Sequence, residues 1–196
     1  MKHRLLVLLI LGLAAPALAQ SFLVSAYDNN SGHGGLLDQS VRIINVGKLG
    51  TPMTSPVGDV CANIYVFDAD QEMIACCSCR LTPNELASAA VGNQLTSNPL
   101  TGVVPISGVV DILPIAAGTQ PCSPISPFST PDASLVQATS THVEITNSYV
   151  FITESELEPA RMGSQQAAFL SNACLFVQYL GGKSGQGGCG CSSPGS

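Results

Sequence analysis

The chain lacks tryptophan and is poor in aromatic side chains (5%) and charged side chains (10%). Basic side chains are scarcest: beyond residue 19 only five remain against thirteen acidic ones, a formal net charge of −8. Nucleic acids and acidic membrane surfaces are bound through clusters of basic side chains. The five are scattered singly along the sequence: Arg42, Lys48, Arg80, Arg161 and Lys183. We therefore expect neither nucleic acid nor an acidic membrane as a partner.

No apolar run is long enough to cross a bilayer, which takes about 20 residues. The run Leu5–Leu13 has nine residues, follows Lys2 and Arg4, and precedes the small-residue sequence Ala17-Leu18-Ala19. This order of features is typical of a secretory signal peptide that is removed after its last small residue. We predict a signal peptide over residues 1–19, a secreted or periplasmic protein, and no membrane anchor after cleavage.

Familiar catalytic motifs are also missing. His33-Gly34-Gly35 resembles an oxyanion-hole loop, but the G-x-S-x-G nucleophile turn that accompanies it in esterases is absent. We expect His142 to be an exposed or edge histidine of a strand, and Gly182-Lys183-Ser184 lacks the earlier glycine of a phosphate loop. The sequence thus predicts no catalytic residue and no cofactor.

The residues that are abundant favour a β protein, since Val, Ile and Thr recur between Gly, Pro, Asn and Asp turns. We predict one β-rich domain over residues 20–180, followed by a Gly/Ser/Cys tail over 181–196. Its fold class is an antiparallel β-sandwich of about seven strands with a short helix and a C-terminal helix. The strands include Ser21–Asp28, Ser40–Val46, and a pair Thr141–Ile145 and Tyr149–Thr153 turning at Asn147-Ser148.

The clearest predicted element is a hairpin of Ala62–Asp68 and Glu72–Ser78. Its first arm is apolar on both faces, which indicates a central strand. If Phe67 lies opposite Glu72, Cys61 lies opposite Ser78, close to the cysteines of the second arm.

Three further segments have distinct signals. Thr82-Pro83-Asn84-Glu85 matches a helix capping box and predicts a short helix from Pro83 to about Val91. Val103–Ile115 contains two prolines and a glycine, so we expect an edge or bent strand. Ser164–Leu180 has apolar residues at helical spacing and predicts the C-terminal helix.

All eight cysteines lie beyond the signal peptide: Cys61, Cys76, Cys77, Cys79, Cys122, Cys174, Cys189 and Cys191. An even number of thiols in an exported chain favours a disulfide framework. We predict that Cys61 bonds to a member of the Cys76–Cys79 cluster, that Cys122 pins a proline-rich connection over 119–134, and that Cys189 or Cys191 fastens the tail. Two alternatives stay open, a zinc or iron site built from the C-x-x-C spacing and a thiol redox site.

Acidic residues at the tip of the hairpin, Asp68, Asp70 and Glu72, are candidate calcium ligands. They do not complete the longer calcium-loop pattern, and turns favour Asp for local hydrogen bonding in any case. A calcium site and an ordinary turn both remain possible interpretations.

The motifs CANIYVFD, EMIACCSC and LTPN, over 61–68, 72–79 and 81–84, resemble a group of secreted cysteine-rich proteins of soil acidobacteria. A late helical cysteine and a glycine-rich cysteine tail, matching Cys174, Cys189 and Cys191, also recur in that group. The resemblance implies export and a disulfide framework, and it implies no catalytic residue.

These observations favour a non-enzymatic extracellular or periplasmic binding or structural module with an unknown ligand or protein partner. The alternatives are a secreted hydrolase whose site is assembled from scattered residues, and a thiol metal-binding or redox protein.

Overall fold

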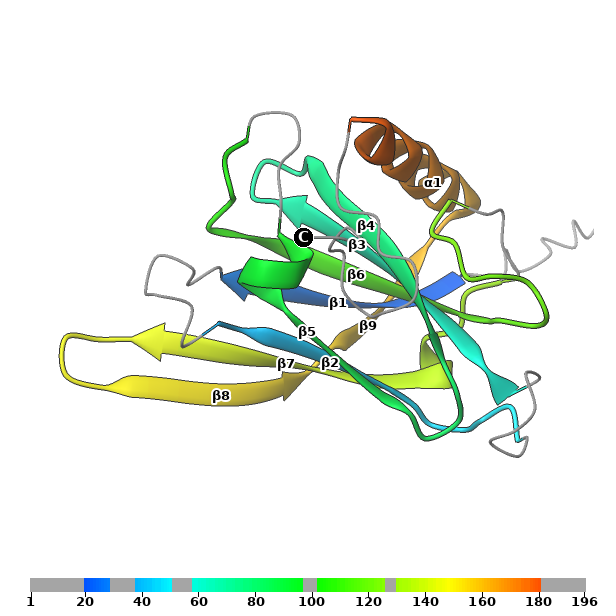
Figure 1. Cartoon of the computed structure of the whole chain (residues 1–196), viewed down its shortest axis with the longest axis horizontal. Coiled ribbons are helices and arrows are strands. Elements are labelled where there is room, and N and C mark those ends of the chain that lie inside the picture. The colour runs from blue at the N-terminus through cyan, green and yellow to red at the C-terminus, as the bar shows by residue number, and fades with distance from the viewer. Residues whose placement is uncertain (1–19, 29–37, 51–57, 97–101, 126–129, 181–196) are drawn as a thin grey trace, which may run out of the picture.

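A computed structural model describes residues 20–28, 38–50, 58–96, 102–125 and 130–180. The predicted class is confirmed, because the described chain forms two antiparallel sheets and one C-terminal helix (Figure 1). It contains nine strands, where about seven were predicted. The signal peptide, His33 and the tail with Cys189 and Cys191 lie outside the described residues.

One sheet has five strands in the order β4-β3-β6-β1-β9. Their bounds are β1 Gln20–Asp28, β3 Val60–Asp68, β4 Met73–Leu81, β6 Ser107–Ala116 and β9 Glu158–Met162. The other has four strands in the order β5-β2-β7-β8, with bounds β2 Ser40–Asn45, β5 Leu86–Ala90, β7 Val136–Ile145 and β8 Val150–Glu156. A π-helical turn, Val91–Leu95, follows β5, and a 3₁₀ turn, Ala133–Leu135, precedes β7.

The molecule has three layers: the four-stranded sheet, the five-stranded sheet, and helix α1 (Ser164–Tyr179) on the outer face of the latter (Figure 1). The main core fills the space between the sheets, where Ile64 and Ile112 meet Ile43. A second core joins the outer face of the five-stranded sheet to α1 through Tyr65 and Leu170. Strand β3 is therefore buried on both faces, as its continuous apolar sequence predicted.

The predicted hairpin is confirmed as β3 and β4, but its register differs from the expectation. Phe67 lies opposite Met73 and not Glu72, a shift of one residue, and a bulge between Val66 and Phe67 adds a second. Together they place Cys61 opposite Arg80 and not Ser78. A bulge adds one residue to one strand only, which the hydrophobic pattern alone does not reveal.

An edge or bent strand was predicted over Val103–Ile115, and the edge position is wrong, because β6 is the central strand, between β3 and β1. Pro114 is tolerated because the β1 pairing extends only to Ile112, so its missing N–H costs no bond to β1, while its carbonyl accepts from Asp132 N at 2.9 Å. Gly108 is required by close packing, since a Cβ there would lie 1.9 Å from the Phe67 carbonyl oxygen. Pro114 and Gly108 are therefore compatible with a central strand.

The predicted helix from Pro83 to Val91 is also wrong. The capping-box contact forms, with Thr82 N and Oγ1 donating to Glu85 Oε2 at 2.7 and 2.9 Å. However, Asn84 has φ +65° and Glu85 N bonds to the Thr82 carbonyl, which makes a tight turn with proline at its second position. A left-handed residue ends helical geometry, so the chain enters β5 instead.

Helix α1 and the β7–β8 hairpin agree with the predictions. The helix was expected over Ser164–Leu180, and its buried residues are Leu170, Cys174 and Val177. The hairpin turns near Asn147, as expected, and both arms run longer than the predicted strands. Figure 1 shows the hairpin projecting beyond the rest of the described structure.

Candidate functional site

Two disulfides are seen among the described residues, Cys61–Cys122 and Cys76–Cys174. The predicted bond from Cys61 to the Cys76–Cys79 cluster is thus wrong. Cys122 pins the proline-rich connection as expected, but onto β3, in a small cluster with Ile115. The pairing of Cys61 with Cys122 depends on how this long connection returns to the sheet. The geometry of the β3–β4 hairpin does not determine that return.

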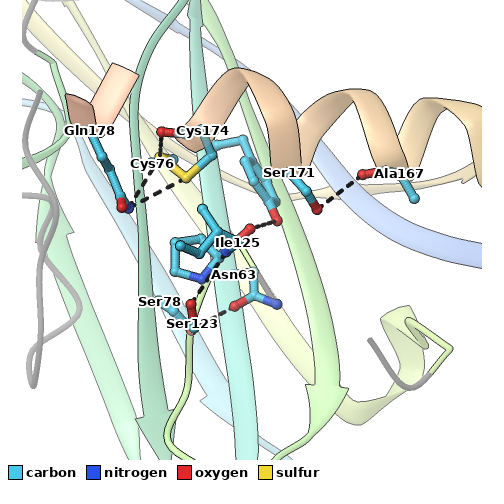
Figure 2. Close-up of a disulfide and its surroundings, with 11 residues drawn as sticks. Asn63, Cys76, Ser78, Ser123, Ile125, Ala167, Ser171, Cys174 and Gln178 are labelled. Atoms are coloured by element: carbon cyan, nitrogen blue, oxygen red, sulfur yellow. Dashed lines mark hydrogen bonds between the residues drawn. A yellow bond between two sulfur atoms is a disulfide. The ribbon is translucent and has the colours of Figure 1, made fainter. Parts of the chain in front are cut away.

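The Cys76–Cys174 bond fastens α1 to β4 (Figure 2). Gln178 Nε2 lies 3.7 Å from Cys76 Sγ and 3.5 Å from Cys174 Sγ. Nearby, Ser78 Oγ donates to Asn63 Oδ1 at 2.6 Å, and both residues are buried. Asn63 Nδ2, by contrast, is buried without an acceptor among the described residues.

Cys77 and Cys79 face the other way, into the core between the two sheets, and both are disulfide-bonded. All six described cysteines are therefore in disulfides. A thiolate metal site or a free redox thiol would have to use some other cysteine.

At the β3–β4 tip, the calcium candidates make an ordinary turn. Asp68 Oδ1 accepts from the backbone N–H groups of Asp70 and Glu72 at 3.0 and 2.9 Å. The tip lines a shallow hollow of about 460 Å³ together with residues 103–107. In the described part of the chain, no three His, Cys, Asp or Glu side chains gather as a metal ion would require.

A second hollow, of about 510 Å³, lies under the projecting β7–β8 hairpin, and we call it the hairpin hollow. It is lined by Asp28, Gln39, Ile106, His142, Val143, Glu144, Ile145, Phe151 and Thr153. His142 and Glu144 share one face of β7, because strand residues two apart point the same way. Their cross-strand neighbours on β8 are Thr153 and Phe151.

The far wall of the hairpin hollow comes from the end of β1 and the segment before β2. Gln39 is only 1% exposed, and its Oε1 accepts from Asp28 N at 3.1 Å, which fixes the end of β1. Gln39 Nε2 is buried with no acceptor among the described residues. Ile106, 79% exposed, lines both this hollow and the one at the β3–β4 tip.

The lining of the hairpin hollow is acidic. Asp28 and Glu144 are exposed carboxylates, His142 is partly buried, and no lysine or arginine lines the hollow among the described residues. Phe151 adds an aromatic surface that is 53% exposed. The hollow can therefore offer carboxylate acceptors beside an apolar face.

His142 is the one residue noted in the sequence that lies in this hollow, and β7 is an inner strand, so the edge interpretation is wrong. Asp68, Asp70 and Glu72 line the other hollow. Ile106 and Phe151 come from two distant segments and had no motif. The alternation of the predicted hairpin could have placed Phe151 and Thr153 on one face, but not against β1.

No protein-family model matches the chain, and no curated protein matches it. Among solved structures, the crystal structure of Thermotoga maritima 1070 is similar to it with a TM-score of 0.41 and 11% identity, covering 71% of this chain and 93% of that one. So distant a likeness carries no argument about function.

Within the described residues, α1 included, no helix is both long and apolar enough to cross a bilayer.

Proposed function

We propose that the protein is a secreted, non-enzymatic binding module that holds its ligand in the hairpin hollow. The observation that carries the proposal is the lining of this hollow, two carboxylates and a histidine around the exposed ring of Phe151. Binding sites typically combine apolar contact area with a few polar groups that fix orientation. Export is supported by the disulfides, which persist in oxidising compartments.

The chemistry of the lining favours a ligand that donates hydrogen bonds and carries positive charge. Asp28 and Glu144 accept but do not donate when ionised, and no lysine or arginine among the described residues lines the hollow to neutralise them. A cation can also contact the face of Phe151. Amino sugars combine ammonium and hydroxyl donors with an apolar ring face, so they are suitable probes.

Titration calorimetry with glucosamine oligomers tests the proposal, with glucuronic acid as the anionic counterpart. We expect the amino sugar to bind and the acidic sugar not to bind. Glu144→Gln should weaken binding about tenfold, which corresponds to the loss of one charge-assisted contact of about 1.4 kcal/mol. Glu72→Gln, at the β3–β4 tip outside the hollow, is the matched control and should bind as the wild type does. Equal binding of both sugars would contradict the proposal.

A hydrolase is the second candidate, and one observation favours it: His142 lies directly across from the hydroxyl-bearing Thr153 in the same hollow. A hydroxyl beside a histidine is the minimal arrangement for an activated nucleophile. A panel of chromogenic ester, glycoside and peptide substrates separates the two. Turnover that Thr153→Val abolishes would show that the protein is a hydrolase and not a non-enzymatic binding module.

A further inference from the structure

Strand β8 is an edge strand whose first three side chains are apolar and exposed, on both faces of the sheet. It pairs with β7 on one side and has no strand on the other among those described. Tyr149, just before the strand, is 69% exposed, and the first strand residues Val150, Phe151 and Ile152 are exposed by 45, 53 and 63%. Because strand residues alternate, Val150 and Ile152 lie on the face opposite to Phe151. An exposed apolar edge of this kind is a template for pairing with another strand.

The acidic residues of β8 do not place negative charge at this part of the edge. Glu154 accepts from Thr139 Oγ1 at 2.7 Å and from Arg42 Nη1 at 3.2 Å. Glu156 accepts from Gln137 Nε2 at 3.0 Å. Both carboxylates are thus drawn back over the sheet, toward β7 and β2, and away from the open side of the strand.

The other three described edges carry protection that β8 lacks. Strand β4 is linked to α1 by a disulfide, and β9 contains Glu158, Pro159 and Arg161. Strand β5 has only five residues and passes directly into a π-helical turn. Natural sheets block their edges with such coverings, charges, prolines and short strands. The first half of β8 has none of these.

We propose that two copies of the chain associate by antiparallel pairing of β8 with β8, centred on Phe151. This register sets Phe151 opposite the same residue of the second copy and Val150 opposite Ile152. Each Glu154 then falls opposite Ser148, beyond the apolar segment. A shift that centres the pair on residue 154 would place the two Glu154 carboxylates face to face, which is unfavourable.

Charge limits where two copies can meet, because two chains that each carry excess acid repel one another over most of their surface. The segment Tyr149–Thr153 is free of charge, and its three central residues, Val150, Phe151 and Ile152, match their own reverse order in apolar character. A second copy can therefore pair along this edge without placing like charges opposite one another. The contact is short, since stable interfaces bury about 1,600 Å², so we expect association in the micromolar range.

Sedimentation velocity of the mature, oxidised chain from about 1 to 500 μM tests the proposal. We expect a monomer–dimer equilibrium that Ile152→Lys weakens at least tenfold. Ile152 is chosen because it does not line the hairpin hollow, so this test is independent of the proposed ligand site. Leu175→Lys, at a position of α1 with similar exposure (55%), is the matched control and should dimerise normally.

A pair of variants tests the register. Val150→Lys and Ile152→Glu should each dimerise more weakly alone. Their equimolar mixture should recover association, because the introduced ammonium of one copy then faces the introduced carboxylate of the other. A wild-type chain that stays monomeric over the whole range overturns the proposal. So does a dimer that Ile152→Lys leaves intact, one that Leu175→Lys dissociates, or a mixture that fails to recover.

Discussion

Cys76 of β4 is bonded to Cys174 in the middle of α1, with their Cα atoms 5.7 Å apart. The bond joins residues 98 positions apart in sequence and ties the helical layer to an edge strand of the five-stranded sheet. Beside it, Leu170 and Val177 supply the buried apolar contacts of the helix. The helix is thus held by one covalent link and a narrow apolar stripe.

Replacing both Cys76 and Cys174 by serine should therefore loosen α1 selectively. A bridge that closes a loop of this length contributes up to about 4 kcal/mol to the free energy of unfolding. We expect a loss of that order in urea unfolding and faster hydrogen exchange of the α1 amides. The matched control replaces Cys61 and Cys122, which should cost similar stability but leave α1 protected. Equal exchange of α1 in both variants would contradict the assignment.

Cys77 and Cys79 are predicted to bond to the tail cysteines, Cys189 and Cys191. Two residues apart on a strand, Cys77 and Cys79 have Cα atoms about 7 Å apart, at the limit for a disulfide with each other. The tail cysteines are the two that remain, and they have the same spacing.

Tryptic digestion without reduction tests the tail link, because cleavage after Lys48, Arg80, Arg161 and Lys183 separates the cysteines into four peptides. We expect peptides 49–80, 81–161, 162–183 and 184–196 to stay together as one assembly in mass spectrometry. Release of 184–196 with an internal disulfide would show instead that Cys77 bonds to Cys79. A chain with serine at 189 and 191 is the control that must release this peptide.

Asp111 should make the protein less stable as the pH rises from 4 to 6. It is 9% exposed on β6, between Tyr65 and Val24 of the neighbouring strands. Burial raises the pKa of Asp111 from 3.8 to about 6. Between these values the unfolded chain releases the proton and the folded chain keeps it, so the free energy of unfolding falls with pH. Above pH 6 the loss is complete, about 3 kcal/mol at about 1.4 kcal/mol per pKa unit.

Urea unfolding of the wild type and Asp111→Asn at several pH values between 3.5 and 7.5 measures this effect. The asparagine variant should gain stability relative to the wild type across that range. Asp70→Asn, at the exposed β3–β4 tip, should follow the wild-type curve throughout. Parallel curves for the wild type and Asp111→Asn would show that the carboxyl is not held in its neutral form by burial.

The elements that could be predicted from the sequence are those whose signal is local. The apolar run of β3, the turn at Asn147 and the helical spacing around Leu170 each specify an element by themselves, and all three are present in the structure. The two-sided burial of β3 also followed from its sequence, because both sets of alternate residues are apolar.

The errors came from residues whose role depends on distant partners. Gly108 and Pro114 were interpreted as breakers, but close contact with Phe67 and the early end of the β1 pairing fit them to a central strand. Thr82 and Glu85 make the same contact in a turn as in a helix cap. Local signals of this kind are ambiguous until the tertiary neighbours are known.

The hairpin hollow could not be predicted for the same reason. Its walls come from the end of β1, from Ile106, and from the β7–β8 hairpin, which are separated by tens of residues. His142 was noted beforehand, but its neighbours are set by how the two sheets stack. The cysteine pairing failed similarly, since Cys122 reaches Cys61 through a connection without regular structure.

Strand β4 carries sulfur bridges at three of its nine residues, Cys76 on one face and Cys77 and Cys79 on the other. A protease must draw a stretch of backbone out of its sheet before it can cut, and edge strands are the first to peel. With β4 anchored from both sides, we expect this edge to resist cleavage. Among the described elements, digestion of the oxidised protein is expected to begin at the projecting turn between β7 and β8.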